Sequence, residues 1–241
     1  MSYLIVAYYT CDNIYTSCAK NFIKSAQKFN LPYMVTPIEN RGSWLENTQF
    51  KPTFLKQQME KLKVDSLVYI DIDAEFIENP ELFQILSDCP NTLVGAHNLD
   101  HKKFGRGDKF ELLSGTLYLK NCKEIYDLIE NWEKECAQNK GIWDQKALEN
   151  VLNKQKISYY PLPEEYCVIF DYMKSVKNPV ILHHQASRKV KDNEAARNKI
   201  EFTEEEIQEA IKKRVRLAGV PVPKKVQKGG ITRYHRKWRN I

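Results

Sequence analysis

The chain alternates short apolar runs with longer amphipathic stretches over most of its length. The run LIVAYYT at 4–10 is apolar and rich in β-branched and aromatic residues, which is typical of a buried strand. The following stretch, 14–29, places apolar residues three and four positions apart, which predicts an amphipathic helix. The same patterns predict further strands at 32–38, 66–73, 91–97, 114–120, 157–163 and 179–184. They predict further helices at 52–63, 121–138, 144–155 and 203–215.

This order of elements predicts an α/β fold. Strands that alternate with helices form largely parallel sheets that carry helices on both faces. We therefore expect one Rossmann-like domain over residues 1–200, with a mixed, mostly parallel sheet. Ligands of such sheets bind at the carboxyl ends of the strands. Residues 201–241 are expected to form a helix and a basic C-terminal tail.

Charge is concentrated at the end of the chain. The 241 residues suffice for one sizeable core and carry a formal net charge of +6. No acidic residue follows Glu209, whereas 11 Lys and Arg do, so the rest of the chain is acidic overall. Tyr234, His235 and Trp238 lie among these basic residues. Three interpretations of the tail stay open: it binds nucleic acid, it binds an anionic membrane surface, or it is solvated or folds back on the acidic body.

Other features of the composition indicate a cytoplasmic protein, in the cytoplasm of the host if the chain is viral. No apolar run approaches the roughly 18 residues of a membrane span, and MSYLIVAYYT lacks the basic start of a signal peptide. The six cysteines include no CxxC pair, so neither a zinc ribbon nor a disulfide scaffold is indicated.

Two aspartates follow the apolar run SLVYI. Side chains alternate along an extended segment, so Asp71 and Asp73 point the same way. Two carboxylates on one side suit a hard divalent cation such as Mg²⁺ or Mn²⁺. With 11 aspartates in the chain, a D-x-D arises by chance about half of the time, so the tripeptide alone is weak evidence. Its position directly after a strand favours a metal site. The chain has no GxxxxGK[ST] or GxGxxG loop, so a bound nucleotide requires a cation and basic side chains.

Two further stretches carry candidate residues. In ILHHQASRK, either His183 or His184 is a candidate third metal ligand, or the histidine simply ends a strand. The donors that this stretch offers to phosphate oxygens are Gln185, Ser187, Arg188 and Lys189. In GIWDQKALENVL, Asp144 and Gln145 open a helix, and the residues alone favour Asp144 as its N-cap.

Taken in order, these stretches resemble a known family. GSWLENTQFKPTFL, LVYIDIDAEFIENPELF, SGTLYLKN, WDQKAL and HHQASRK are similar to blocks of metal-dependent glycosyltransferases of the GT-A fold, the nucleotide-diphospho-sugar transferases, in bacterial and phage members. The resemblance covers roughly residues 3 to 190. It implies transfer of a sugar from a nucleotide-diphosphate donor, most simply a UDP-sugar, to an acceptor hydroxyl.

The resemblance also implies roles for single residues. Asp71, Asp73 and His183 would coordinate Mn²⁺ or Mg²⁺, which bridges the donor diphosphate. Ala186 replaces the glycine of the family's H-x-x-G-x-x-K pattern, which puts close backbone approach to the phosphate in doubt. Asp144 and Gln145 match the sugar-contacting pair. The remaining donor-site residues by this resemblance are Tyr9, Thr10, Trp44, Lys51, Arg188 and Lys189.

Stereochemistry, acceptor and reaction class stay open. The Asp-Gln pair resembles retaining members, whereas an inverting enzyme needs a carboxylate base, a role that Asp144 also suits. The acceptor interpretations are a hydroxyl on modified phage DNA, slightly favoured, and a lipopolysaccharide or lipid-linked glycan. Paired aspartates with basic surfaces also occur in metal-dependent nucleotidyltransferases and nucleases. A non-catalytic module that binds sugar nucleotides or DNA is the remaining alternative.

Overall fold

The computed structural model describes residues 2–189. The predicted boundary near residue 200, the helix at 203–215 and the basic tail lie outside these residues. The strands are β1 (Tyr3–Thr10), β2 (Tyr33–Ile38), β3 (Ser66–Ile70), β4 (Ala74–Phe76), β5 (Val94–Asp100), β6 (Phe110–Lys120), β7 (Tyr160–Pro161), β8 (Val168–Ile169) and β9 (Ile181–His183). The α-helices are α1 (Asn13–Lys28), α2 (Trp44–Gln49), α3 (Lys51–Lys61), α4 (Leu82–Asp88), α5 (Lys123–Gln138) and α6 (Asp144–Gln155).

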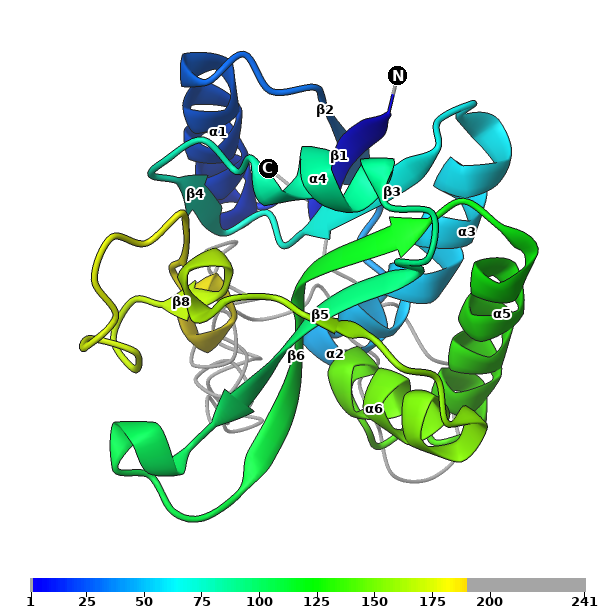
Figure 1. Ribbon diagram of the computed structural model, residues 1–241. Helices are drawn as coiled ribbons and strands as arrows, with labels where there is room; N and C mark the ends of the chain where they lie inside the picture. The colour runs from blue at the N-terminus through cyan, green and yellow to red at the C-terminus, as the bar shows by residue number, and fades with distance from the viewer. Residues whose placement is uncertain (1, 190–241) are drawn as a thin grey trace, which may run out of the picture. The chain divides into compact units, whose positions relative to one another are not determined.

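The main sheet has six strands in the order β2-β1-β3-β6-β5-β7. β1 runs parallel to β2 and β3, and β5 runs parallel to β7. β6 is antiparallel to both of its neighbours, β3 and β5, and Figure 1 shows β5 and β6 as a long hairpin across the molecule. A second, small sheet has the order β4-β9-β8. The expected α/β fold with a mixed sheet is therefore confirmed.

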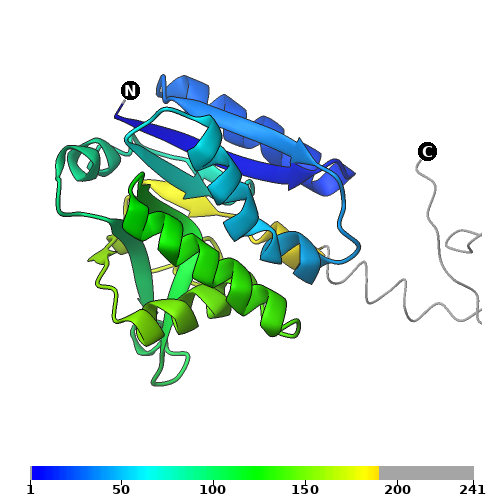
Figure 2. The same cartoon turned by 90° about the vertical axis from the view of Figure 1, so that its right-hand side faces the viewer.

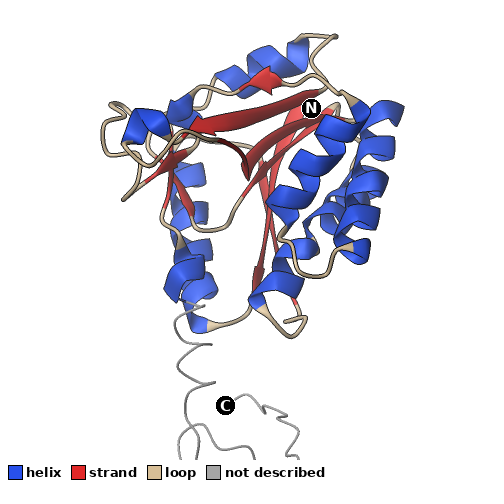
Figure 3. Cartoon of the chain, turned by 90° about the horizontal axis from the view of Figure 1, so that it is seen from below, coloured by secondary structure: helices blue, strands red, loops and turns tan. Residues whose placement is uncertain are grey.

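Two hydrophobic clusters cover the two faces of the main sheet. Successive residues of β1 belong alternately to the two clusters. Ile5 and Ala7 pack in the cluster under α1 and α4, while Val6 and Tyr8 pack in the cluster under α3, α5 and α6. Helices flank the strands on both sides in Figure 3, and Figure 2 shows α5 and α6 packed side by side. This two-sided cover explains why the strands are continuous apolar runs.

Several boundaries differ from the sequence prediction. The third strand ends at Ile70, and a turn, closed by the Ala74 N–H on the Asp71 carbonyl at 3.0 Å, separates it from β4. The predicted strand at 157–163 is reduced to two paired residues, because Pro161 and Pro163 have no N–H for a ladder. The short elements α2, α4, β4 and β8 were missed, since each is too brief to show a period.

Within residues 2–189 no helix is both long and apolar enough to cross a membrane. All six cysteines lie in this part of the chain, and Cys11, Cys89, Cys122, Cys136 and Cys167 are free thiols.

Candidate active site

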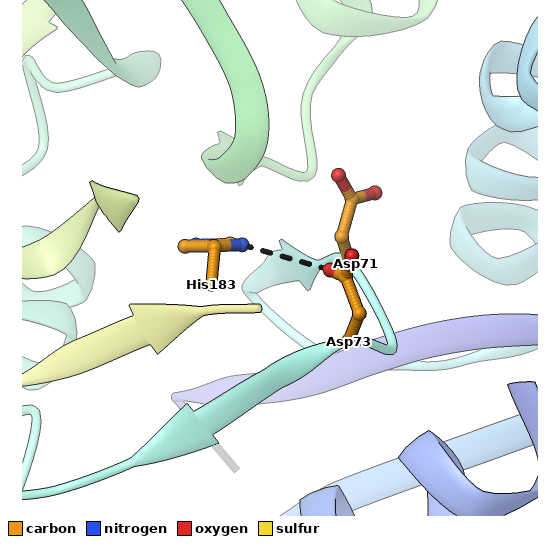
Figure 4. A group of neighbouring side chains, drawn as sticks. All are labelled: Asp71, Asp73 and His183. Atoms are coloured by element: carbon orange, nitrogen blue, oxygen red, sulfur yellow. Dashed lines mark ion pairs between the residues drawn. The ribbon is translucent and has the colours of Figure 1, made fainter. Parts of the chain in front are cut away.

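The structure brings Asp71, Asp73 and His183 together. The aspartates occupy the turn between β3 and β4, and His183 ends β9, where antiparallel pairing sets it opposite Ala74. One ligating atom from each residue lies within 4.8 Å of the other two. The Nδ1 atom of His183 is 4.0 Å from Oδ1 of Asp73, and Figure 4 shows the imidazole directed at the aspartates. This cluster is a candidate cation site formed by two sheets.

Backbone donors hold Asp73 in place. The N–H of Ala186 donates to Oδ2 of Asp73 at 2.8 Å, and the N–H of His184 donates to the Asp73 carbonyl at 3.0 Å. Burial, together with the negative charge of Asp71, raises the pKa of the Asp73 carboxyl to about 6. A bound cation would remove this repulsion, so the site favours a positive ion.

Hydrogen bonding fixes the tautomer of His183. Thr116 donates its hydroxyl hydrogen to the Tyr166 carbonyl at 3.0 Å, so its oxygen accepts from Nε2–H of His183 at 2.9 Å. Nδ1 then carries the free lone pair on the side facing the aspartates. Burial lowers the pKa of His183 to about 4, which keeps the ring neutral at physiological pH. A neutral imidazole with its second nitrogen anchored is the usual form of a metal-ligating histidine.

His183 and His184 have different partners. His183 is 5% exposed and faces the aspartates, whereas Nε2 of His184 is 3.2 Å from Oε2 of Glu75. His183 is therefore the histidine of the candidate cation site.

Gly115 in β6 leaves room beside this cluster. A Cβ at Gly115 would lie 3.1 Å from Oδ2 of Asp71 and 3.2 Å from Cε1 of His183. Gly115 and Thr116 are not among the site residues predicted from the sequence. The available signal was a glycine inside the strand run SGTLYLK, which marks a close approach of another group.

The donor set fits the expected cation. Two carboxylates suit Mg²⁺ and Mn²⁺, and the imidazole shifts the preference toward a transition metal. Asp71, Asp73 and His183 therefore suit Mn²⁺ better than Mg²⁺.

Lys51 links the aspartates to α6. It is 3% exposed, and its Nζ lies 3.2 Å from Oδ1 of Asp71 and 2.7 Å from Oδ2 of Asp144. Tyr69 donates its hydroxyl to the same Asp71 oxygen at 2.8 Å. Burial opposes the charge of Lys51, but Asp144 and Asp71 outweigh it and raise its pKa. The ammonium thus stays charged between two carboxylates.

The N-cap interpretation of Asp144 is wrong. Trp143 is the N-cap of α6, and Asp144 is the first helical residue. The Asp144 carboxylate instead accepts from Lys51 and, at 2.8 Å, from the Ser114 hydroxyl. The Gln145 amide is fixed as well: its Oε1 accepts from the Ser114 N–H at 3.2 Å. Asp144 and Gln145 therefore lie next to Lys51, on the α6 side of the cation site.

The predicted residues Tyr9 and Thr10 lie at the end of β1, and Trp44 lies at the start of α2. Tyr9 is half-buried near the end of β1. Thr10, the last residue of that strand, is buried and donates its hydroxyl to Oδ2 of Asp12 at 2.6 Å. Asp12 in turn caps α1. Trp44 is half-buried and begins α2.

The remaining predicted residues follow β9. Gln185 adopts a left-handed conformation with φ of 54° and leads into a helical turn at 186–189. Ser187 is half-buried, and Lys189 is exposed. Arg188 forms an ion pair with Asp171 and is engaged there rather than at the cation cluster.

The family follows from the sequence match. A model of the family described as "Nucleotide-diphospho-sugar transferase" matches residues 65–202, more than half of the chain. The chain belongs to this family. It is thus a GT-A-like glycosyltransferase that uses a nucleotide-sugar donor. No curated protein sequence matches the chain.

Solved structures share the fold of this nucleotide-diphospho-sugar transferase. One is a glycosyltransferase involved in the glycosylation of the major capsid of PBCV-1, which matches with a TM-score of 0.62 at 12% identity over 80% of this chain and 98% of that one. Another is the glycosyltransferase GlyE of Streptococcus pneumoniae TIGR4, with a TM-score of 0.52 at 16% identity over 75% of this chain and 54% of that one.

Proposed function

We propose that this transferase moves a sugar from a UDP-sugar to an acceptor hydroxyl in a reaction that depends on Mn²⁺. The observation that carries the proposal is the cluster of Asp71, Asp73 and His183, in which Thr116 leaves Nδ1 of the imidazole free. A cation held there supplies charge to the donor diphosphate and stabilises it as a leaving group.

The chain's own residues prepare this site. Lys51 and Tyr69 hold Asp71, and the Ala186 N–H holds Asp73, so neither carboxylate must reorient when the donor binds. Gly115 keeps the adjacent space open.

We further propose a retaining reaction. The Asp144 carboxylate is 4% exposed and already bonded to Lys51 and Ser114, so it is poorly placed to act as the free base that inversion requires. Attack from the face of the departing diphosphate needs no such base. The anomeric configuration of the product, measured by NMR, tests this: an inverted product would contradict it.

For the acceptor, we propose a hydroxyl on a polyanion, with modified DNA ahead of a lipopolysaccharide glycan. The support is the 11 basic residues after Glu209, with aromatic residues among them. A gel shift of modified duplex DNA that weakens with salt, and a stimulation of sugar transfer by that DNA, are the expected results. Transfer to a lipid-linked glycan, without any binding of DNA, would show that the glycan and not DNA is the acceptor.

The decisive experiment measures UDP release. The full chain is incubated with Mn²⁺ and a panel of UDP-sugars, and Asp73→Asn is compared with Asp127→Asn, which alters an exposed carboxylate on α5. We expect release from one donor that requires Mn²⁺, is lost in Asp73→Asn and persists in Asp127→Asn. A folded protein that releases nothing from any donor, with or without Mn²⁺, would refute the proposed function.

A further inference from the structure

A connected line of polar groups leads from the cation cluster to the beginning of β6. Lys51 joins Asp71 to Asp144, and Gln145 follows on α6. The Gln145 amide then donates from Nε2 to Oε1 of Glu111 at 2.7 Å. Glu111 therefore belongs to the same network as the cation site, although neither the sequence patterns nor the family resemblance singled it out.

A buried histidine fixes the other oxygen of Glu111. Nε2 of His101 lies 2.8 Å from Oε2 of Glu111, and the Tyr172 hydroxyl forms a hydrogen bond with Nδ1 of the same ring. If the Tyr172 hydroxyl donates to Nδ1, a neutral ring has its hydrogen on Nε2 and donates it to the carboxylate. The His101 side chain is 8% exposed and that of Glu111 is 30% exposed. The Glu111 carboxylate is thus held rigidly, with one side open to solvent.

Among the described residues, lysine compensates the negative charge of Glu111 only weakly. Nζ of Lys109 lies 3.6 Å from Oε2 of Glu111, but its side chain is 62% exposed. Exposed pairs of this kind are screened by solvent and salt. An approaching ligand therefore meets the carboxylate as a negatively charged acceptor.

Gln145 and Glu111 retain hydrogen-bonding capacity after these contacts. Within residues 2–189, Gln145 uses one of its two amide hydrogens on Glu111, and each Glu111 oxygen accepts one bond, which leaves lone pairs free. A donor next to an acceptor matches a sugar hydroxyl, which both accepts and donates. Glu111 lies four residues before Gly115 on β6, about 13 Å along the strand, a span that accommodates a sugar linked to a diphosphate at the cation.

We propose that Glu111 is a specificity-determining residue that selects a neutral sugar on the donor and excludes a hexuronate. This inference rests on the proposed function, since it concerns the donor of the same reaction. The hydroxymethyl group of a hexose donates a hydrogen bond to the Glu111 carboxylate. The carboxylate of the corresponding hexuronate has no hydrogen to donate and brings a second negative charge, so the site discriminates by repulsion as well as by attraction.

The test compares matched donors with Mn²⁺ present: UDP-glucose with UDP-glucuronate, and UDP-galactose with UDP-galacturonate. For the wild-type chain we expect kcat/KM for the preferred hexose to exceed that for its hexuronate by about 100-fold or more. Glu111→Gln keeps the shape and removes the charge, so it lowers this ratio by about tenfold or more, mainly through faster turnover of the hexuronate. Glu149→Gln, which changes a carboxylate that pairs with Lys146 on α6, leaves the ratio unchanged.

The outcomes separate the two proposals. Mn²⁺-dependent turnover with equal use of hexose and hexuronate by the wild-type chain overturns the role of Glu111 and leaves the proposed function intact. A Glu111→Gln variant that folds normally but slows both donors by the same factor shows a merely structural role and also overturns it. If the variant is unstable, the wild-type ratio alone still tests the role of Glu111, because equal use of hexose and hexuronate would overturn it. If no donor gives Mn²⁺-dependent release of UDP, the proposed function is refuted, and the inference about Glu111 is refuted with it.

Discussion

The ammonium of Lys51, near the start of α3, lies 2.7 Å from the carboxylate of Asp144, the first residue of α6, and both side chains are buried. This ion pair joins two helices on the same face of the sheet and reaches the cation cluster through Asp71. Because the pair is removed from water, losing one partner leaves an uncompensated charge in the interior.

Lys51→Met is therefore expected to lower the free energy of unfolding by about 3–5 kcal/mol. The methionine replaces most of the lysine stem, so the loss reflects the stranded carboxylates of Asp144 and Asp71. Urea denaturation measures it. Lys56→Met, also in α3, breaks a partly exposed pair with Glu130 of α5 and should leave the unfolding free energy nearly unchanged. Adding Asp144→Asn to Lys51→Met should restore part of the loss, and no restoration would argue against the ion pair as the cause.

Gly115→Ala is expected to weaken cation binding while the fold persists. The new methyl group would lie 3.1 Å from Oδ2 of Asp71, close enough to displace that ligand. We expect the affinity for Mn²⁺, measured by calorimetry, to fall by about tenfold or more. Gly141→Ala is the matched control, because a Cβ there meets no atom of residues 2–189 within 4 Å. Equal Mn²⁺ affinities for the two variants would contradict the assigned role of Gly115.

Thr116→Val should lower Mn²⁺ affinity by about 10- to 100-fold, because the hydroxyl that anchors Nε2–H of His183 is lost. The valine has nearly the same shape, so the β6 strand should survive. Thr116→Ser restores a hydroxyl and should recover most of the affinity. If valine and serine behave alike, the hydroxyl does not orient the imidazole.

Cation affinity is expected to depend on a single proton between pH 4 and 6. Asp73 has its pKa raised to about 6 by burial and by Asp71, whereas burial lowers the pKa of His183 to about 4. A falling pH therefore protonates Asp73 first, and each Mn²⁺ that binds must displace that proton. Below pH 6 the affinity should fall about tenfold per pH unit, measured by calorimetric titration. A slope of two protons per cation in this interval would show that His183 titrates as well.

The same two groups oppose each other in the stability of the cation-free protein. The pKa of Asp73 is raised from 3.8 to about 6 in the folded protein. This residue therefore contributes stability below pH 4 that is lost as the pH rises to 6. The pKa of His183 is lowered from 6.5 to about 4 in the folded protein. This residue therefore contributes stability above pH 6.5 that is lost as the pH falls to 4. Asp73→Asn removes only the first effect. Its unfolding free energy, measured in EDTA, should therefore rise more steeply from pH 4 to 6.5 than that of the wild-type chain; a parallel curve would contradict the shift of Asp73.

The sequence predicts the parts of this molecule that depend on local pattern. The strand at LIVAYYT, the helix that follows it and the pair Asp71 and Asp73 all carry a period or spacing that identifies them. The pairing of Lys51 with Asp144 has no such mark, since it joins residues far apart, and a local rule assigned Asp144 to a helix cap instead. Thr116 was missed because its role depends on the direction of β6, which the order of elements does not determine.

The cation cluster depends on β9, which has consequences for synthesis of the chain. Asp73 and His183 are more than a hundred residues apart in sequence, and the N–H that holds Asp73 belongs to Ala186. During translation, the main sheet from β1 to β6 can pair before β9 has emerged from the ribosome. The candidate cation site is therefore completed at a late point in the protein's own production, and a chain cut short before residue 183 cannot assemble this three-residue cluster.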